Sequence, residues 1–345
     1  MKVLVTGNQG YIGHALIDEL LREKFEIVGV DLGFFPNDFS ENYRGNEKIE
    51  QIKKDIRDLK KDDLRGFDAI LHLAALSNDP SADLNPKWTE DINYRATVRL
   101  AELAKEVGVE RFVFSSTCSV YGAQGNKLLT EESECHPIST YAVSKLKAER
   151  DLVKLSNQRF APIILRSATA FGVSPRMRFD LVVNNLTASG YTTGKILLLS
   201  DGTAWRPNVH IKDISNAFVA VLKAPFAEVN GEIFNVGMKS ENYGVKDIAK
   251  IVAEVIPNTE IEFVKNASKD IRSYSVDFSK IQSLKNFKPG VTVKMGVKEI
   301  YDTFKSKNFK REDFTDKKYH NVKFMKDLIE NKRLDENLKP TAISI

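Results

Sequence analysis

A group of three glycines near the N-terminus constrains the fold of this chain more than any other feature. Gly7, Gly10 and Gly13 follow a short apolar run at residues 3–6 and precede an amphipathic stretch at residues 14–22. Between a strand and a helix, the first glycine allows a tight turn, the second lets the backbone approach a pyrophosphate, and the third lets the helix pack closely on the strand. The N-terminus of that helix then faces the phosphates. The spacing therefore predicts a dinucleotide-binding loop.

An acidic residue follows at the position that such a loop requires. A second β-like run at residues 25–30 ends at Asp31. A carboxylate there accepts hydrogen bonds from the two hydroxyls of a ribose and repels a 2′-phosphate. We therefore expect NAD as the cofactor, in preference to NADP.

Strand-like and helix-like patterns alternate along the first half of the chain. Apolar runs at residues 69–74, 111–115 and 161–165 are separated by helical patterns such as those at residues 93–106 and 142–154. This alternation indicates βαβ units and a parallel sheet. Continuous apolar strands are typical of a sheet that helices cover on both faces. We predict an α/β fold, a doubly wound parallel sheet of the Rossmann type.

The alternation weakens after about residue 165, which predicts a smaller, discontinuous C-terminal substrate lobe. We expect an NAD-binding domain at residues 1–171 with its sheet completed by segments near 205–238, a substrate-binding lobe at 172–204 and 239–310, and a charged tail at 311–345. The formal net charge of +4 arises between Lys305 and the C-terminus, so we expect a weakly basic, solvated tail. Such a tail lacks the concentrated basic face of a nucleic-acid-binding protein.

Other features of the composition exclude several classes of protein. The chain has two cysteines, Cys118 and Cys135, which excludes a disulfide framework and a four-cysteine metal site. The histidines show no metal-binding spacing, and we expect no metal. No apolar run approaches the roughly 18 residues of a membrane span, and the N-terminus lacks the features of a signal peptide. We expect a cytoplasmic protein with no membrane or nucleic-acid partner.

A tyrosine and a lysine indicate a catalytic base. Tyr141 and Lys145 open a predicted helix, and residues four apart lie on one helix face. A nearby ammonium lowers the pKa of a phenol, which is about 10 in isolation, toward the neutral range. The hydroxyl-rich segment at residues 115–122 directly follows a strand. It is therefore expected at the carboxyl edge of the sheet, where ligands bind.

With these motifs the chain resembles the extended short-chain dehydrogenase/reductase family, which comprises sugar-nucleotide epimerases, dehydratases and reductases. The resemblance covers residues 2–304 and rests on segments 6–13, 55–58, 73–75, 115–122 and 206–210, together with Asn93, Tyr141 and Lys145. It implies NAD-dependent chemistry on a nucleotide-diphosphate sugar. It also implies a homodimer that forms through two helices of each subunit.

The resemblance implies a role for each matching residue. The catalytic residues are Thr117, which would bond the reacting substrate oxygen, Tyr141 as the base, and Lys145, which would bond the nicotinamide ribose. The cofactor-binding residues are Gly7, Gly10, Tyr11, Ile12, Gly13, Asp31, Asp55, Ile56, Leu73, Ala74, Ala75, Asn93, Tyr141 and Lys145. The substrate-binding residues are Asn78, Asp79, Thr117, Cys118, Thr169, Asn185, Arg206 and Arg272.

Two residues after Thr117 depart from the family pattern. Dehydratases that act at C4 and C6 carry Asp-Glu there, and decarboxylases carry Glu at the second position, whereas this chain has Cys118 and Ser119. Neither residue is a carboxylic acid, which argues against both reactions. Cys118 is either a buried, inert residue or an acid/base.

Two further positions do not decide which nucleotide sugar is the substrate. The loop that contains Asp79 is expected to overhang the hexose, where Asp79 is either a sugar ligand or acid/base, or a turn residue before Pro80. Galactose-type 4-epimerases have Asn-Pro where this chain has Thr169 and Ala170. The nucleotide and the sugar are therefore not identified.

We expect an NAD-dependent sugar-nucleotide epimerase that acts through a transient 4-keto sugar. Tyr141 would take the C4 hydroxyl proton while the C4 hydride moves to the nicotinamide, and the hydride would return to the other face of the sugar. One alternative is an NAD(P)H-dependent 4-keto sugar-nucleotide reductase with the same residues. Another is a non-catalytic dinucleotide-sensing or scaffold protein on the same fold, although the intact set of Thr117, Tyr141 and Lys145 argues against it.

Overall fold

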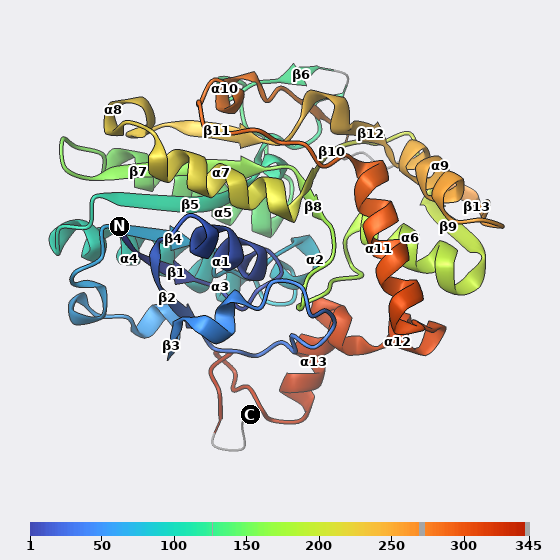
Figure 1. The fold of residues 1–345 in the computed structure, drawn as a ribbon, viewed down its shortest axis with the longest axis horizontal. Helices are drawn as coiled ribbons and strands as arrows, with labels where there is room; N and C mark the ends of the chain where they lie inside the picture. Colours follow the sequence, from blue (N-terminus) through green and yellow to red (C-terminus); the bar gives the residue numbers. More distant parts are fainter. Residues whose placement is uncertain (126, 269–272, 342–345) are drawn as a thin grey trace.

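A seven-stranded parallel sheet forms the centre of the protein (Figure 1). The computed structural model describes residues 1–125, 127–268 and 273–341. The strand order is β11-β7-β5-β4-β1-β2-β3, and each neighbouring pair runs parallel. The doubly wound parallel sheet that the sequence predicts is confirmed. The strands are β1 (Lys2–Thr6), β2 (Glu26–Asp31), β3 (Glu50–Lys53), β4 (Ala69–His72), β5 (Arg111–Thr117), β7 (Ala161–Ser167) and β11 (Ile233–Val236).

Helices cover both faces of this sheet because its inner strands are apolar on both sides. Val3 and Val5 of β1 belong to one buried cluster, and Leu4 belongs to a second. Since alternate residues of a strand point to opposite faces, the two clusters lie on opposite sides of the sheet. The first cluster includes residues of α1 (Gly13–Arg22) and α7 (Ile211–Lys223), and the second includes residues of α4 (Ala96–Glu106) and α5 (Thr140–Lys154). Figure 1 shows α1 and α7 in front of the sheet.

A second group of elements lies beside the carboxyl ends of the strands, at the right of Figure 1. Helices α6 (Val182–Thr193), α9 (Val245–Val255) and α11 (Val293–Lys307) pack around an apolar cluster of their own. The parallel pair β9 (Lys195–Ser200) and β13 (Glu260–Ser268) contributes to it. Shorter elements are β6 (Leu128–Leu129), β14 (Ser275–Val276), α2 (Asp79–Ala82), α3 (Pro86–Thr89), α8 (Phe226–Val229) and α10 (Ser279–Gln282).

Only part of the segment near residues 205–238 joins the large sheet. β11 pairs with β7 at the sheet edge, as expected. In contrast, β10 (Trp205–His210) lies between β8 (Thr169–Phe171) and β12 (Asn242–Gly244) in a separate three-stranded sheet. The reason is that β11 already occupies the edge beside β7, so β10 pairs instead with the strand that follows β7 in the chain.

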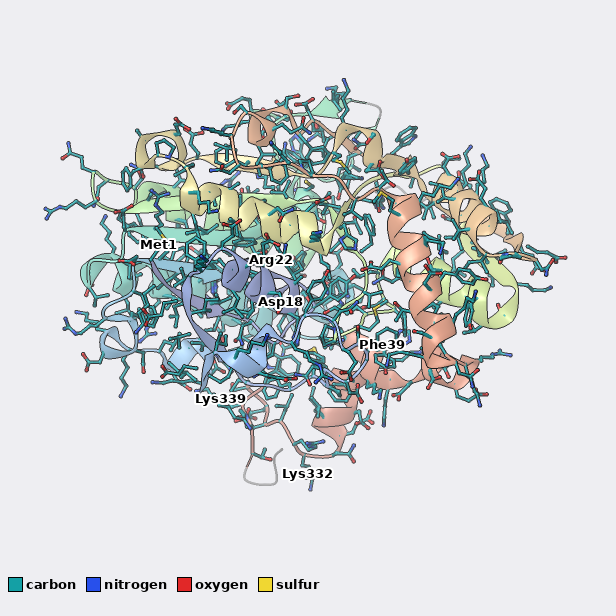
Figure 2. The ribbon with its side chains drawn as sticks, viewed as in Figure 1. Met1, Asp18, Arg22, Phe39, Lys332 and Lys339 are labelled. Atoms are coloured by element: carbon teal, nitrogen blue, oxygen red, sulfur yellow. The ribbon has the colours of Figure 1, made fainter. Side chains whose placement is uncertain are left out.

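The end of the chain folds back onto the loops that follow β2 and β4. After α12 (Arg311–Thr315), residues 321–340 form α13 (Asn321–Glu330) and a short turn, which together we call the C-terminal segment. Met325, Leu328, Leu334 and Leu338 are at most 4% exposed. The expectation of a solvated tail is wrong for this segment, because these four apolar side chains form one buried cluster, which a count of charges does not reveal. Figure 2 labels Lys332 and Lys339 on it, below the sheet.

A buried ion pair joins α5 to the sheet. The side chains of Glu149 on α5 and Arg166 on β7 are 1% and 4% exposed, and their closest nitrogen and oxygen atoms are 2.7 Å apart. The Ser116 hydroxyl of β5 also donates to the Glu149 carboxylate. Because α5 begins at Thr140, the positions of Tyr141 and Lys145 in its first turns depend on this pair.

Removing one partner of this pair is expected to destabilise the protein strongly. Glu149→Ala leaves the Arg166 charge buried without its counter-ion, which typically lowers the free energy of unfolding by about 3–5 kcal/mol. Urea unfolding followed by circular dichroism measures this loss. The double variant Glu149→Leu/Arg166→Met should lose less than Glu149→Ala, because neither charge remains.

A surface pair provides the matched control. Lys154 of the same helix is 73% exposed and pairs with Asp151, so Lys154→Ala should cost less than about 1 kcal/mol. If Glu149→Ala cost no more than Lys154→Ala, the buried pair would not anchor α5.

Candidate active site

A large cavity opens at the carboxyl ends of β1, β4 and β5. The strand order reverses between β1 and β4, and in doubly wound sheets ligands bind in the crevice at this point. The cavity brings together all but one of the sequence-predicted cofactor residues. They are Gly7, Gly10, Tyr11, Ile12, Gly13, Asp31, Asp55, Ile56, Leu73, Ala74, Ala75, Tyr141 and Lys145.

The remaining residue of that set, Asn93, lies behind the cavity wall. It is fully buried. Its side-chain amide accepts from the backbone N–H of Leu76 at 2.8 Å and donates to the Leu76 carbonyl at 3.0 Å. Asn93 therefore holds the loop after β4 in place.

The glycine loop is packed tightly on one side and open on the other. Gly7 has a φ of +75°, and a Cβ there would lie 2.6 Å from the backbone nitrogen of Ala74. A Cβ on Gly13 would lie 2.4 Å from the Gly7 carbonyl oxygen. A Cβ on Gly10 would meet only that same oxygen, at 3.0 Å, and would otherwise point into open space. The backbone at Gly10 therefore faces open space, on the side where we expect the pyrophosphate of a dinucleotide.

Asp31 ends β2 at the rim of this loop. Its carboxylate accepts hydrogen bonds from the backbone N–H groups of Gln9, at 3.1 Å, and Gly33, at 2.9 Å. Burial raises the pKa of Asp31, and the two backbone donors partly offset this. A carboxylate has about four acceptor sites, so acceptor capacity remains for the hydroxyls of a ribose.

Tyr141 and Lys145 reach the cavity from the first two turns of α5, which Ser139 caps. The Lys145 ammonium donates to the Ser115 carbonyl at 2.8 Å and lies 5.8 Å from the centre of the Tyr141 ring. Burial lowers the pKa of Lys145 to about 7. Burial also raises the pKa of Tyr141 above its ordinary value, and the Asp79 carboxylate adds to this rise.

Arg178 is a cation near Tyr141 that sequence reasoning did not assign to the site. Its charge lowers the pKa of Tyr141, against the effect of burial. Its guanidinium pairs with Asp180 at 2.9 Å and donates to the Ser77 hydroxyl at 3.2 Å. It lines the cavity together with Arg176. The only sequence signal was two arginines in a loop after residue 172, which a motif search does not recognise.

Thr117 and Cys118 lie at the end of β5 but outside the lining of this cavity. The Thr117 hydroxyl accepts from the Ser119 N–H and donates to the Ser119 hydroxyl, both at 3.1 Å. Cys118 is 1% exposed, and its thiol donates to the Arg166 carbonyl at 3.1 Å. Burial raises the pKa of this thiol. This geometry matches the buried, inert alternative, because the short turn at Cys118–Tyr121 points the side chain into the apolar core.

The other predicted substrate residues are not gathered around the same cavity. Asn78 donates to Asp180 at 2.6 Å, and Asp79 accepts from the Ser139 hydroxyl at 2.5 Å. Asp79 thus links α2 to the cap of α5. Thr169 and Arg206 lie in the three-stranded sheet, where Thr169 on β8 pairs with Asn208 and Arg206 on β10 lies 5.6 Å from the Tyr274 ring centre. Asn185 on α6 donates to the Phe179 carbonyl. Arg272 lies outside the described residues.

The C-terminal segment is the largest part of the site that sequence reasoning missed. Five of its residues line the cavity, namely Asn321, Met325, Leu328, Leu334 and Leu338. The spacing of Met325 and Leu328, followed by the two leucines, was the available signal.

Across residues 1–125, 127–268 and 273–341, no group of three or more His, Cys, Asp or Glu side chains could hold a metal ion. Within the same ranges, no helix is long and apolar enough to cross a membrane.

Alignments with known proteins of similar sequence cover most of this chain. An uncharacterized UDP-glucose epimerase of Bacillus subtilis (strain 168) is 30% identical, over 86% of this chain and 96% of the relative. The UDP-glucose 4-epimerase of Mycolicibacterium smegmatis is 29% identical, over 89% of this chain and all of the relative. The UDP-glucuronic acid decarboxylase 1 of Arabidopsis thaliana is 28% identical, over 89% of this chain and 70% of the relative.

Solved structures show the same fold with the cofactor bound. The UDP-glucuronic acid 4-epimerase of Bacillus cereus, in complex with UDP-glucuronic acid and NAD, superposes with a TM-score of 0.77 at 27% identity, over 89% of this chain and 99% of that one. The model of the NAD dependent epimerase/dehydratase family matches residues 3–237. With the glycine loop, Asp31 and the Tyr141–Lys145 pair around one cavity, the chain therefore belongs to this NAD-dependent family.

Proposed function

We propose that this protein is a sugar-nucleotide 4-epimerase that acts through a transient 4-keto sugar, with Tyr141 as the base. The observation that carries the proposal is the arrangement of Tyr141 and Lys145 in the same cavity as the glycine loop and Asp31. Two relatives named above are a UDP-glucose 4-epimerase and a UDP-glucuronic acid 4-epimerase. These names support a uridine-diphosphate sugar as the substrate.

The residues after Thr117 support epimerisation over the other reactions of the family. Expelling water or carbon dioxide after oxidation needs an additional acid/base close to the sugar. Here Cys118 is buried, and its thiol donates a hydrogen bond to a backbone carbonyl. The Ser119 hydroxyl accepts a hydrogen bond from Thr117. Neither side chain is a carboxylic acid. Epimerisation at C4 needs only one base, which removes a proton and later returns it.

NAD, when bound, supplies the hydride acceptor and donor. Tyr141 takes the proton of the C4 hydroxyl. It returns this proton once the 4-keto sugar has rotated to present its other face. Because burial favours the neutral phenol, the phenolate needs a cation beside it. Arg178 supplies positive charge to Tyr141. The Lys145 side chain lies 5.8 Å from the centre of the Tyr141 ring and donates to the Ser115 carbonyl. Thr117 is proposed to bond the same substrate oxygen once sugar is present.

The proposed reaction makes a distinct isotope prediction. UDP-glucose or UDP-glucuronic acid incubated with the enzyme in deuterated water should give the C4 epimer without new deuterium, because the migrating hydrogen moves as hydride and never exchanges with solvent. No NADH or NADPH should be consumed. Mass spectrometry of the product and the absorbance of the reduced cofactor measure both. Deuterium at C3 or C5 would contradict C4 chemistry, and consumption of one reduced cofactor per product would indicate a reductase.

Replacing the base tests its role. Tyr141→Phe removes one oxygen and little packing, so the turnover rate should fall by about 10²–10⁴-fold, while the dissociation constant for NAD should change little. Tyr94→Phe is the matched control, because the Tyr94 phenol bonds Asp151 at the surface, away from the cavity. A wild-type rate in Tyr141→Phe would rule out the assignment.

A further inference from the structure

The C-terminal segment forms one wall of the cavity in which the glycine loop and Asp31 lie. Its buried side chains pack against residues from two separate loops. Phe34 and Phe35 come from the loop after β2, and Leu76 comes from the loop after β4. Since β1 lies between β2 and β4 in the sheet, the segment spans the crevice from one side to the other.

Hydrogen bonds fasten this wall at both ends. At its start, the Asn321 amide oxygen accepts from Arg176 at 2.5 Å, and its nitrogen donates to the Ser77 hydroxyl at 3.2 Å. Arg176 itself lies 4.0 Å from the centre of the Phe35 ring. Each of these residues is part of the cavity lining.

At the far end, three contacts hold the turn of the segment to the sheet domain. The Trp88 indole N–H donates to the Glu336 carbonyl at 2.6 Å, and Arg57 donates to the Asn337 carbonyl at 2.8 Å. Lys339 forms an ion pair with Asp58 at 2.8 Å. Arg57 and Asp58 directly follow Asp55 and Ile56, so the turn is tied to the loop that carries these two predicted cofactor residues.

We propose that the C-terminal segment completes the dinucleotide site and slows the release of bound NAD, so that the cofactor stays on the enzyme between turnovers. The inference rests on the proposed function in that the cavity is taken as the NAD site. Its physical basis is that Met325, Leu328, Leu334 and Leu338 close the crevice with apolar surface. NAD can leave on this side only if the segment detaches and exposes that surface to water.

A retained cofactor suits an epimerase better than a reductase. An epimerase regenerates NAD within each turnover, so it gains nothing from exchange. A reductase must release the oxidised cofactor and bind a reduced one every time. A wall that retains the cofactor therefore fits the redox-neutral reaction proposed above.

The test measures the release of NAD and does not depend on activity. Full-length protein is loaded with NAD that carries a stable isotope in its adenine, mixed with excess unlabelled NAD, and sampled over time by rapid filtration and mass spectrometry. The variant Trp88→Ala/Lys339→Ala removes two fastenings that lie outside the cavity lining. Release should become at least tenfold faster in this variant.

Two control variants keep the cavity and its wall intact. Lys326→Ala removes an exposed lysine from α13, and Trp205→Ala removes a tryptophan that is 41% exposed on β10. Both should release NAD at the wild-type rate. If the double variant were folded and also released NAD at that rate, the proposal would be overturned.

Hydrogen exchange of the wild-type protein gives a second measurement that needs no variant. Binding of NAD should slow the exchange of backbone amides at residues 321–340, and unchanged exchange there would overturn the proposal. A wild-type protein that bound no NAD at all would overturn the proposed function as well. If the protein bound NAD without faster release in the double variant and without slower exchange at residues 321–340, only this inference would be overturned, and the proposed function would stand.

Discussion

The close backbone contact between the glycine loop and the end of β4 is the constraint on which the rest of the site depends. Gly7 lies against Ala74 with no space for a side chain, and Gly13 lies equally close to the Gly7 carbonyl. These contacts bring the N-terminus of α1 to the point where the strand order reverses. Since Gly7, Gly10 and Gly13 line the cavity, a side chain at Gly7 or Gly13 would displace the loop that faces the cofactor.

A second constraint positions the proposed catalytic side chains at that crevice. Helix α5 is held to β5 and β7 by the buried Glu149–Arg166 pair, and it presents Tyr141 and Lys145 to the cavity. Burial opposes charge on both residues, which raises the pKa of one and lowers that of the other. The site therefore favours neutral side chains until substrate and cofactor bring polar groups of their own.

The cofactor half of the site could be predicted from sequence because its information is local. Three glycines between a strand and a helix, or two residues four apart on one helix, specify their geometry without knowledge of the rest of the fold. The C-terminal segment could not be recognised in this way, since Leu334 and Leu338 acquire a role only when the chain returns to Phe35 and Leu76. The same holds for Arg178, whose effect on Tyr141 depends on a loop distant in sequence. The sequence allows Cys118 to be an acid/base or an inert residue, and only the structure shows that it is buried.

In the proposed reaction, the hydrogen taken from C4 returns to the same sugar molecule, within a site that keeps its cofactor. A crossover measurement follows this hydrogen. UDP-glucose deuterated at C4 is mixed with UDP-glucose that carries carbon-13 but no deuterium, in the presence of excess free NAD, and the epimerised products are analysed by mass spectrometry. We expect deuterium to stay on the carbon-12 sugar. Epimerised product that carries both carbon-13 and deuterium would contradict this expectation.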